Sequence, residues 1–542
     1  MEVLFAVIAF FLLYRGLIPT KNDTPIALNN PHLNVPKQIS LSPIIWLKNF
    51  WENLTTFPKA NTTFGSATLM STKELKKDVL NKTHDGILID GKYGRLKNKE
   101  CVNMLICGST GSAKTSSIII PNLLRTNNFS SYIITDPSGE ILETVGHTLI
   151  LNGISIKVLN LEGEGESVCY NPLTMANSTK EIGKLCRIIL DSSSGGAATE
   201  KFWIDGGCMI LESLIKALKN YPDQSFCNMA NLKLLLDSYN QKDNIVLNQF
   251  MKKHLKNKED FIAYQGIMNG SDSKIIAGFI STCRTSLSLY SERHLARLTS
   301  INTINLKELR RTRTALFIQF SEGSTSYYAG LLKILYTQIF DILMEKPLAP
   351  FNRHVHIFLE EFANVGKILN FSKYITTLRK RNCNIILVIQ ALEQITALYG
   401  QHHAEAIVTG GINTKLFLSN GLSLKTCQHI SQIIGCTTIQ QSDSGNLSSR
   451  SVLNADEVRL LPSNTGILLH HSRKPALVRL NRFYQDKKLS ALAGRYFKYN
   501  QGTPLPPLKF IPLEQEPIHS SSPIKNKEEN KDGSNDNIVF DL

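Results

Sequence analysis

Residues 102–115 read VNMLICGSTGSAKT, and this stretch decides the fold class. Its apolar first half is typical of a buried strand, its second half is a loop of small residues, and residues 116–124 are expected to form a helix. Small residues let backbone N–H groups close around phosphate oxygens, and the N-terminus of the following helix adds partial positive charge. The stretch therefore predicts a P-loop, with a chance glycine-serine turn before a helix as the alternative.

The predicted P-loop would bind ATP with Mg²⁺. We expect Lys114 to reach the β- and γ-phosphates and Thr115 to hold the metal ion. Ala113 stands where the general pattern G-x-x-x-x-G-K-[ST] has glycine, and its Cβ is costly if the backbone there needs a positive φ. This departure therefore bears on turnover more than on nucleotide binding. The expected nucleotide-binding residues are Gly108, Ser109, Thr110, Gly111, Ser112, Ala113, Lys114 and Thr115.

An acidic pair follows a second apolar run. Residues 355–359 are typical of a strand, and Glu360 and Glu361 come directly after it. Glu360 occupies the position at which an aspartate usually organises the metal, so it is the candidate partner of Thr115. Glu361 is the candidate general base. The alternative is a solvated acidic pair at the start of the next helix.

Two further polar sites accompany the apolar run of residues 384–389. Gln390 follows this run and is placed to sense the γ-phosphate, or it is simply the first residue of a helix. Arg379 and Arg381 precede the run, and either is a candidate arginine finger for the nucleotide of a neighbouring subunit. The alternative is that these cations stabilise the C-terminus of a helix.

A common placement links these residues. Strands that alternate with helices predict an α/β fold with a parallel sheet, and ligands of such sheets bind at the carboxyl ends of the strands. Gly108, Asp136, Glu360 and Gln390 all lie at expected strand ends. The sequence thus predicts a single nucleotide site and a P-loop ATPase.

Composition sets broader limits. The chain has 542 residues, enough for roughly two or three domains. With 42% hydrophobic and 19% charged residues it is typical of a globular body, not of a polytopic membrane protein. The net charge of +15 suits nucleic acid or an anionic lipid surface, or is only a solvated basic surface. Ten cysteines form no CxxC pair, which favours a reducing cytoplasm.

The amino terminus is apolar. Residues 3–14 form an unbroken apolar run, shorter than the roughly 20 residues of a full membrane span. Arg15 and Lys21 follow it and would leave the rest of the chain in the cytoplasm. We interpret residues 1–20 as a membrane anchor and residues 21–63 as a membrane-proximal linker. An interfacial helix or a signal-like segment is the alternative.

The middle of the chain has a different pattern. Between residues 173 and 298 the apolar spacing is that of helices, for example in residues 203–218. We predict an all-helical domain there, inserted between two parts of a nucleotide-binding domain, residues 64–172 and 299–500. Beyond these, the prolines and polar residues of 501–542 predict a disordered tail.

The ordered series of motifs resembles the TraG-type coupling proteins of type IV secretion and conjugation, from about Gly65 to Val478. Ser138 stands where that family has lysine. The motifs that carry the resemblance are Phe64 to Ala67, Gly108 to Thr115, Pro121 to Leu124, Thr135 to Glu140, Tyr170 to Leu173, Phe358 to Gly366, Gln390 to Gln394, Tyr399 with Gly400, Ser431 to Gly435 and Asp456 to Arg459.

The resemblance implies a RecA-like P-loop NTPase core with an inserted all-helical domain, assembled as a homo-hexamer on the cytoplasmic side of the bacterial inner membrane. It implies a protein that recruits DNA and/or protein substrates to a type IV secretion channel and drives or licenses their transfer by ATP hydrolysis. Channel components and the membrane would be its other partners. The departures at Ala113, Ser138 and Glu360 favour a non-hydrolysing substrate receptor as one alternative. A cytoplasmic DNA translocase is another.

Overall fold

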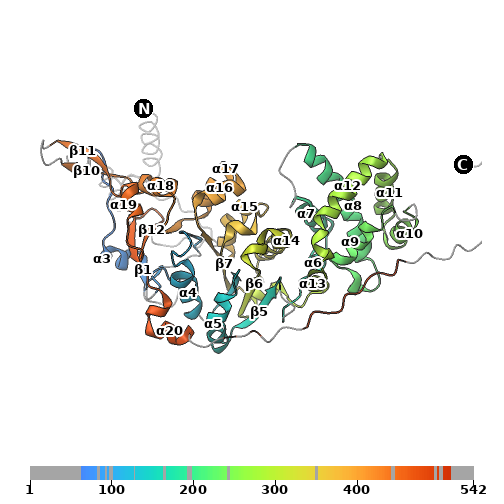
Figure 1. Cartoon of the computed structure of the whole chain (residues 1–542), viewed down its shortest axis with the longest axis horizontal. Coiled ribbons are helices and arrows are strands. Elements are labelled where there is room, and N and C mark those ends of the chain that lie inside the picture. The colour runs from blue at the N-terminus through green and yellow to red at the C-terminus, as the bar shows by residue number, and fades with distance from the viewer. Residues whose placement is uncertain are drawn as a thin grey trace, which may run out of the picture. The chain divides into compact units, whose positions relative to one another are not determined.

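A computed structural model of the chain describes residues 63–513 apart from short gaps (Figure 1). The gaps are residues 82–85, 92–93, 97–101, 127–128, 163–165, 192–197, 241–243, 271, 348–351, 441–445, 494–496, 498 and 500–503. The chain divides into two units at Thr63, and the second is described here. The predicted anchor, the linker up to residue 62 and the tail beyond residue 513 lie outside the described residues. Among the helices that are described, none combines the length and the apolar character needed to cross a membrane.

A nine-stranded sheet forms the centre of the described part. Seven neighbouring strands are parallel, and two antiparallel strands extend one edge. Strands such as β3, β4 and β8 are buried along their whole length, which explains why they appear in the sequence as continuous apolar runs. In sheet order the strands are β13 (Ala476–Arg479), β12 (Thr465–His470), β9 (Thr414–Leu418), β3 (Met104–Cys107), β8 (Cys383–Ile389), β7 (His354–Leu359), β4 (Ser130–Thr135), β6 (Thr314–Gln319) and β5 (Ser155–Asn160).

The strand order brings three predicted segments together. Strand β8 lies between β3 and β7, with Cys107 opposite Ile389 and Leu387 opposite Leu359. The P-loop, Gln390 and Glu360 therefore follow three adjacent parallel strands at the same edge of the sheet. This is the edge at which ligands bind in open parallel sheets.

Helices cover both faces of the sheet, because successive side chains of a strand point to opposite faces. On β3, Met104 and Ile106 belong to one core, and Leu105 and Cys107 to the other. The first core includes α4 (Ile120–Leu124), α5 (Glu140–Leu151) and α20 (Lys487–Ala493). The second includes α14 (Thr325–Met344), α15 (Phe371–Leu378) and α16 (Leu392–Tyr399).

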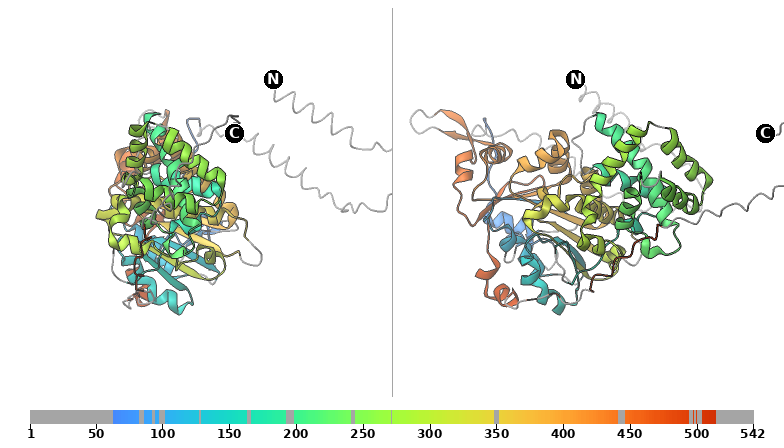
Figure 2. Two further views of the ribbon diagram at one scale, coloured as in Figure 1. Left: turned by 90° about the vertical axis from the view of Figure 1, so that its right-hand side faces the viewer. Right: turned by 45° about the vertical axis from the view of Figure 1, so that its right-hand side comes forward.

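A group of helices is inserted between β5 and β6 (Figures 1 and 2). These two strands pair directly, from Ser155 opposite Thr314 to Asn160 opposite Gln319, so the insertion leaves the sheet continuous. Between them, the residues that the structure describes contain helices and no strand. The helices are α6 (Pro172–Met175), α7 (Thr179–Asp191), α8 (Ala198–Lys219), α9 (Met229–Asp237), α10 (Ile245–His254), α11 (Lys258–Gly270), α12 (Ser273–Ser286) and α13 (Arg293–Leu298).

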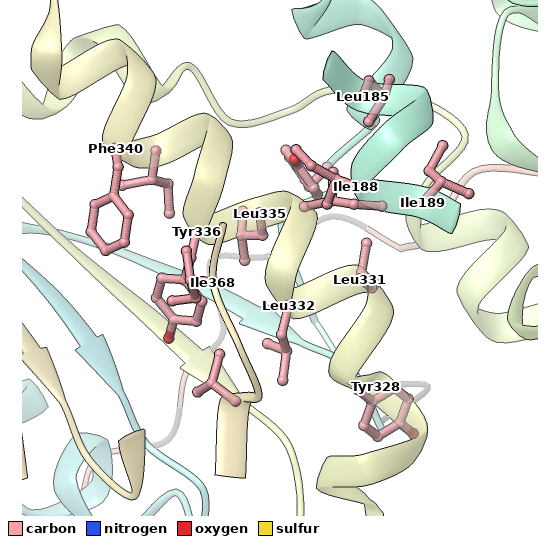
Figure 3. Close-up of a cluster of buried hydrophobic side chains, with 14 of the residues drawn as sticks. Leu185, Ile188, Ile189, Tyr328, Leu331, Leu332, Leu335, Tyr336, Phe340 and Ile368 are labelled. Atoms are coloured by element: carbon pink, nitrogen blue, oxygen red, sulfur yellow. The ribbon is translucent and has the colours of Figure 1, made fainter. Parts of the chain in front are cut away.

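Helix α7 packs the insertion onto α14 of the sheet layer (Figure 3). Leu185 and Ile188 of α7 and Leu331 and Leu335 of α14 are buried in one core. Next to this apolar contact, Lys184 of α7 forms an ion pair with Asp341 of α14 at 2.6 Å. The insertion is thus held to the sheet layer by both apolar and charged contacts.

A hydroxyl group completes the charged contact. The Lys184 ammonium donates to the Tyr374 hydroxyl oxygen at 2.8 Å, and that hydroxyl donates to Asp341 Oδ1 at 2.7 Å. Tyr374 belongs to α15, which follows the acidic pair in the chain. These three residues, the Lys184–Asp341–Tyr374 triad, connect the helical insertion with two helices of the sheet layer.

The structure corrects one part of the predicted disorder. Residues 504–513 form neither helix nor strand, as their prolines require, yet they pack along the helical insertion. Leu505 and Ile511 are buried, and Arg297 of α13 donates from Nε to the Pro506 carbonyl oxygen at 3.0 Å. The prediction of disorder was wrong for this segment because local composition does not reveal that its apolar side chains find a helical surface to cover.

Short elements surround the sheet. The longest is α18 (Leu424–Ile434), which leads into the hairpin of β10 and β11. The remaining ones are α3 (Thr72–Glu74), β1 (Leu80–Asn81), β2 (Arg95–Leu96), α17 (Gln401–Glu405), β10 (Cys436–Gln440), β11 (Leu447–Ser451) and α19 (Ala455–Arg459).

Candidate nucleotide-binding site

The P-loop joins the end of β3 to a helical turn that begins at Thr115 and continues into α4. The Lys114 side chain folds back over the loop, where its ammonium donates to the carbonyl oxygens of Gly108 at 2.8 Å and Ser109 at 3.0 Å. Burial lowers the pKa of Lys114, and the carboxylates of Glu361 and Glu360 act in the opposite direction. A buried cation therefore lies inside the loop, as the binding of phosphate requires.

The loop also contains an unsatisfied hydroxyl. Ser112 is buried, and its Oγ has no hydrogen-bond partner among the described residues. Gly108 lies close to it, because a Cβ at Gly108 would come within 2.5 Å of Ser112 Oγ. Buried polar groups without partners are rare and often mark the place of a ligand or a water molecule. The Ser112 hydroxyl and the Lys114 ammonium fit the oxygens of a phosphate group.

Ala113 has the backbone conformation that makes its side chain costly. Its φ is 68°, in the left-handed region, and that of Gly111 is 76°. A residue with a Cβ is disfavoured there by about 1–2 kcal/mol. The backbone at residue 113 therefore does have the positive φ that makes a Cβ costly. The loop contains local strain that a glycine would not have.

The candidate metal ligands are in direct contact. Thr115 donates a short hydrogen bond from Oγ1 to Oε1 of Glu360. The pKa of Glu360 is raised to about 7, mainly by burial and further by the nearby Asp136 and Glu361 carboxylates, while the Thr115 hydroxyl and the Lys114 ammonium act in the opposite direction. A divalent cation would offset this accumulation of carboxylates.

The donor set fits Mg²⁺ bound together with a nucleotide. Threonine hydroxyl and carboxylate oxygens are ligands that Mg²⁺ takes, and this ion usually keeps several waters and binds substrate phosphates. The described part of the chain contains no group of three or more His, Cys, Asp or Glu side chains that would hold a metal by themselves. Thr115 and Glu360 are therefore expected to hold Mg²⁺ only with the help of phosphate oxygens.

Glu361 and Gln390 face each other across β7 and β8. The Gln390 amide nitrogen Nε2 lies 3.2 Å from both carboxylate oxygens of Glu361. Glu361 adopts φ 51° and ψ 43°, again in the left-handed region. Strained backbone of this kind is common at functional sites, where the surrounding structure enforces it.

Asp136 lies at the same edge of the sheet, but its carboxylate caps the neighbouring helix α5. It is fully buried and accepts hydrogen bonds from the backbone N–H groups of Ile141 at 3.2 Å and Leu142 at 3.0 Å. Gln319 Nε2 donates to it at 3.1 Å. Its carboxylate thus satisfies the first turn of α5, and its charge acts on Glu360 through space.

The structure does not bring the two candidate arginine fingers to this site. Arg379 and Arg381 lie in a short 3₁₀ turn before β8, whereas Gln390 follows the other end of the same strand. A seven-residue strand spans roughly 20 Å at about 3.3 Å per residue. Neither arginine can reach the nucleotide of its own chain, so a role in a neighbouring subunit stays a prediction.

A loop with no functional motif in its sequence contacts the P-loop. Ser109 Oγ donates to the carbonyl oxygen of Asn420 at 2.6 Å. Asn420 and Gly421, which follow β9, have φ values of 94° and 72°. The Asn-Gly dipeptide signals a turn, but only the pairing of β9 with β3 places that turn beside the P-loop.

Together, these features define the class of protein. A P-loop on β3, an acidic pair on β7 and a polar residue on the strand between them form a RecA-like P-loop NTPase core with an all-helical insertion. The predicted fold class is confirmed, and solved structures of similar fold support it.

The family follows from the sequence pattern. Residues 59–505 match the family described as "Type IV secretory system Conjugative DNA transfer", and the chain belongs to this family. Protein VirD4 of Agrobacterium fabrum (strain C58 / ATCC 33970) is 24% identical over 426 residues, which cover 74% of this chain and 61% of VirD4. Protein VirD4 of Rhizobium rhizogenes is 24% identical over 442 residues, with 77% and 63% covered. The chain thus spans about three fifths of the length of these curated relatives.

Solved structures share the fold. The plasmid coupling protein TrwB in complex with ADP and Mg²⁺ superposes with a TM-score of 0.62 at 18% identity, covering 79% of this chain and 96% of TrwB. TrwB in complex with the non-hydrolysable ATP analogue ADPNP has a TM-score of 0.60 at 17% identity, with 77% and 93% covered. The resemblance to type IV coupling proteins inferred from the motifs is confirmed.

Proposed function

We propose that this chain is an ATP-driven coupling protein, which recruits DNA and/or protein substrates to a type IV secretion or conjugation channel and drives their transfer. One observation carries the proposal: Lys114, the Thr115–Glu360 pair and the Glu361–Gln390 pair meet at the ends of three adjacent parallel strands. The family description and the nucleotide complexes of TrwB support it.

Each residue has a separate task at this site. The P-loop amides and Lys114 bind the phosphates, while Thr115 and Glu360 hold Mg²⁺, which neutralises phosphate charge when it is bound. Glu361 accepts the proton of the attacking water. Gln390, which already holds the Glu361 carboxylate from the neighbouring strand, positions this base.

Assembly as a homo-hexamer would give Arg379 and Arg381 a task. Both lie at the far end of β8 from the nucleotide site of their own chain. In a ring, this edge of one subunit is free to approach the nucleotide of the next subunit, where an arginine stabilises the charge of the transferring phosphate. The position of Arg379 and Arg381 at the far end of β8 and their positive charge support this role.

The proposed location is the bacterial inner membrane, with the large unit in the cytoplasm. The family description places such proteins with the secretion system. Residues 1–20 are the proposed anchor, with Arg15 and Lys21 on its cytoplasmic side. DNA or protein substrates and the channel components are the proposed partners.

A second candidate function is a receptor that binds nucleotide without hydrolysing it. The left-handed backbone of Ala113 favours it, because strain in the P-loop weakens the close grip on the γ-phosphate that turnover requires. In this case nucleotide binding would switch the receptor between states, and energy for transfer would come from another component.

Steady-state ATPase activity of the purified full chain separates the two candidates. The first predicts Mg²⁺-dependent turnover that Lys114→Ala reduces at least about 100-fold, a loss of about 2.7 kcal/mol in transition-state stabilisation. Lys76→Ala is the matched control. It removes an exposed lysine that lies outside the P-loop in the sequence, and it should leave the rate unchanged. Equal rates for wild type and Lys114→Ala would exclude hydrolysis at this site. Binding without turnover would establish the second candidate.

A further inference from the structure

The segment of residues 504–513, here called the C-terminal strap, lies on the helical insertion (Figure 1, red segment beside α13). Leu505 and Ile511 are only 7% and 4% exposed, and Leu508, midway between them, is half-buried. Pro507 and Phe510 are exposed. Apolar contacts at every third residue are the pattern of a polyproline II helix, which has three residues per turn.

Two side chains of the insertion bind the main chain of the strap. Arg297 of α13 donates from its guanidinium to the carbonyl oxygens of Leu505 and Pro506. Asn231 of α9 donates from Nδ2 to the Lys509 carbonyl oxygen at 3.0 Å and accepts from the Ile511 N–H at 2.9 Å. These hydrogen bonds recognise the main chain of an extended segment and depend little on which side chains the strap has.

The main-chain contacts belong to a built site. Asn231 is fully buried beneath the strap, and its side-chain amide both donates to and accepts from the strap main chain. An extended segment with free main-chain groups is therefore what this position is suited to receive.

The strap leaves space beside it. A cavity of about 740 Å³ lies between the strap and the helices α9 and α13, and its lining includes Lys233, Tyr290 and Arg293 of the insertion and Pro507 of the strap. The groove is thus wider than its present occupant. Extended proline-containing segments typically bind in grooves of this kind, where aromatic and apolar side chains surround a few main-chain hydrogen bonds.

We propose that α9 and α13 form a binding site for extended, proline-containing chains with an apolar residue at every third position, and that the strap is its built-in ligand. The strap must leave before another chain of this kind can enter, so its presence keeps the site closed. The proposal goes beyond the proposed ATPase function and does not depend on it, because nucleotide has no part in it.

Peptide exchange on the full chain tests this site. The variant Leu505→Asp/Ile511→Asp places charges at the two buried positions of the strap and should release it. A fluorescent peptide with the sequence of residues 504–513 is then added to wild type and to the release variant, and anisotropy is measured. We expect the release variant to bind the peptide at least about tenfold more tightly than wild type, because its groove is open. Equal affinity would overturn the proposal.

Matched substitutions locate the binding. In the release variant, Arg297→Met and Asn231→Leu should each weaken peptide binding at least about tenfold, whereas Arg293→Met, which removes an arginine that lines the cavity without bonding to the strap, should not. In the peptide, Leu508→Asp should abolish binding, and Lys509→Ala, which changes an exposed side chain that does not line the cavity, should leave it unchanged. Equal effects of Arg297→Met and Arg293→Met would contradict the assignment.

A second measurement does not rely on the release variant being folded. An excess of isotope-labelled strap peptide is added to wild type, and hydrogen exchange is followed at the chain's own Ile511 amide, which donates to Asn231. Displacement of the strap should accelerate this exchange, and a scrambled peptide of the same composition should not. Unchanged exchange with the strap peptide would overturn the proposal.

Discussion

The side-chain amide of Gln390 donates to both carboxylate oxygens of Glu361, at 3.2 Å each, from the strand next to it. The two residues are 29 positions apart in the chain, and only the parallel pairing of β7 with β8 brings them together. Glu361 is held in a left-handed backbone conformation at the same point. This arrangement supports the proposed role of Glu361 as general base, because it fixes the position of the carboxylate.

Replacing the base should separate binding from turnover. Glu361→Gln keeps the shape and a hydrogen-bonding partner for Gln390 but cannot accept a proton. We expect the ATPase rate to fall about 10²- to 10⁴-fold while nucleotide affinity stays the same. Glu405→Gln, an exposed glutamate on α17, is the matched control. Retention of the wild-type rate in Glu361→Gln would show that another group takes the proton.

Because Thr115 and Glu360 are in contact, we expect their substitutions to have non-additive effects on Mg²⁺-dependent nucleotide binding. Thr115→Ala and Glu360→Gln should each raise the Mg²⁺ concentration needed for half-maximal nucleotide binding at least about tenfold, because each removes a ligand. The double variant should raise this Mg²⁺ concentration by less than the two single effects combined, since both residues hold one ion. The effects of Thr144→Ala, a substitution on α5, and of Glu360→Gln on this concentration should instead be additive. Titration of binding against Mg²⁺ checks this, and additivity of Thr115 with Glu360 would argue against a shared ion.

Removing the strain in the P-loop should stabilise the chain. Ala113 has a φ of 68°, so Ala113→Gly should raise the free energy of unfolding by about 1 kcal/mol. Gly111→Ala is the reverse test: its φ is 76°, and a Cβ there would meet nothing within 4 Å, so strain alone should destabilise it by a similar amount. Denaturant unfolding measures both. If Ala113→Gly has no effect while Gly111→Ala destabilises, the strain at residue 113 is already relieved elsewhere.

The Lys184–Asp341–Tyr374 triad should stabilise the attachment of the helical insertion. Tyr374→Phe removes a buried hydroxyl that bonds to two charged groups, and we expect a loss of about 1–3 kcal/mol in the free energy of unfolding. Tyr327→Phe is the control, because that tyrosine is 51% exposed. Chemical denaturation of both variants checks the difference. Equal stability of Tyr374→Phe and Tyr327→Phe would mean that the Tyr374 hydroxyl adds no stability to the Lys184–Asp341 ion pair.

Much of the site follows from local sequence. Gly108, Glu360 and Gln390 could be placed at strand ends because each follows a continuous apolar run, and such runs identify buried parallel strands. The condition for strain at Ala113 could also be stated, since it depends on one residue and one backbone angle.

What the sequence could not show depends on contacts between distant segments. The position of β8 between β3 and β7 results from strand pairing, which has no local signature. The pairing of β9 with β3, which likewise has no local signature, places Asn420 beside the P-loop. The packing of residues 504–513 against α9 and α13 likewise depends on a surface formed by residues about 200 to 280 positions earlier.

The most direct test of the account is calorimetric titration of the full chain with Mg²⁺-ADP. We expect one site per chain and at least about tenfold weaker binding in Lys114→Ala, because the buried ammonium of the P-loop no longer faces the phosphates. Lys76→Ala should bind as wild type does. Absence of binding by the wild type, or the same affinity in Lys114→Ala, would contradict the account.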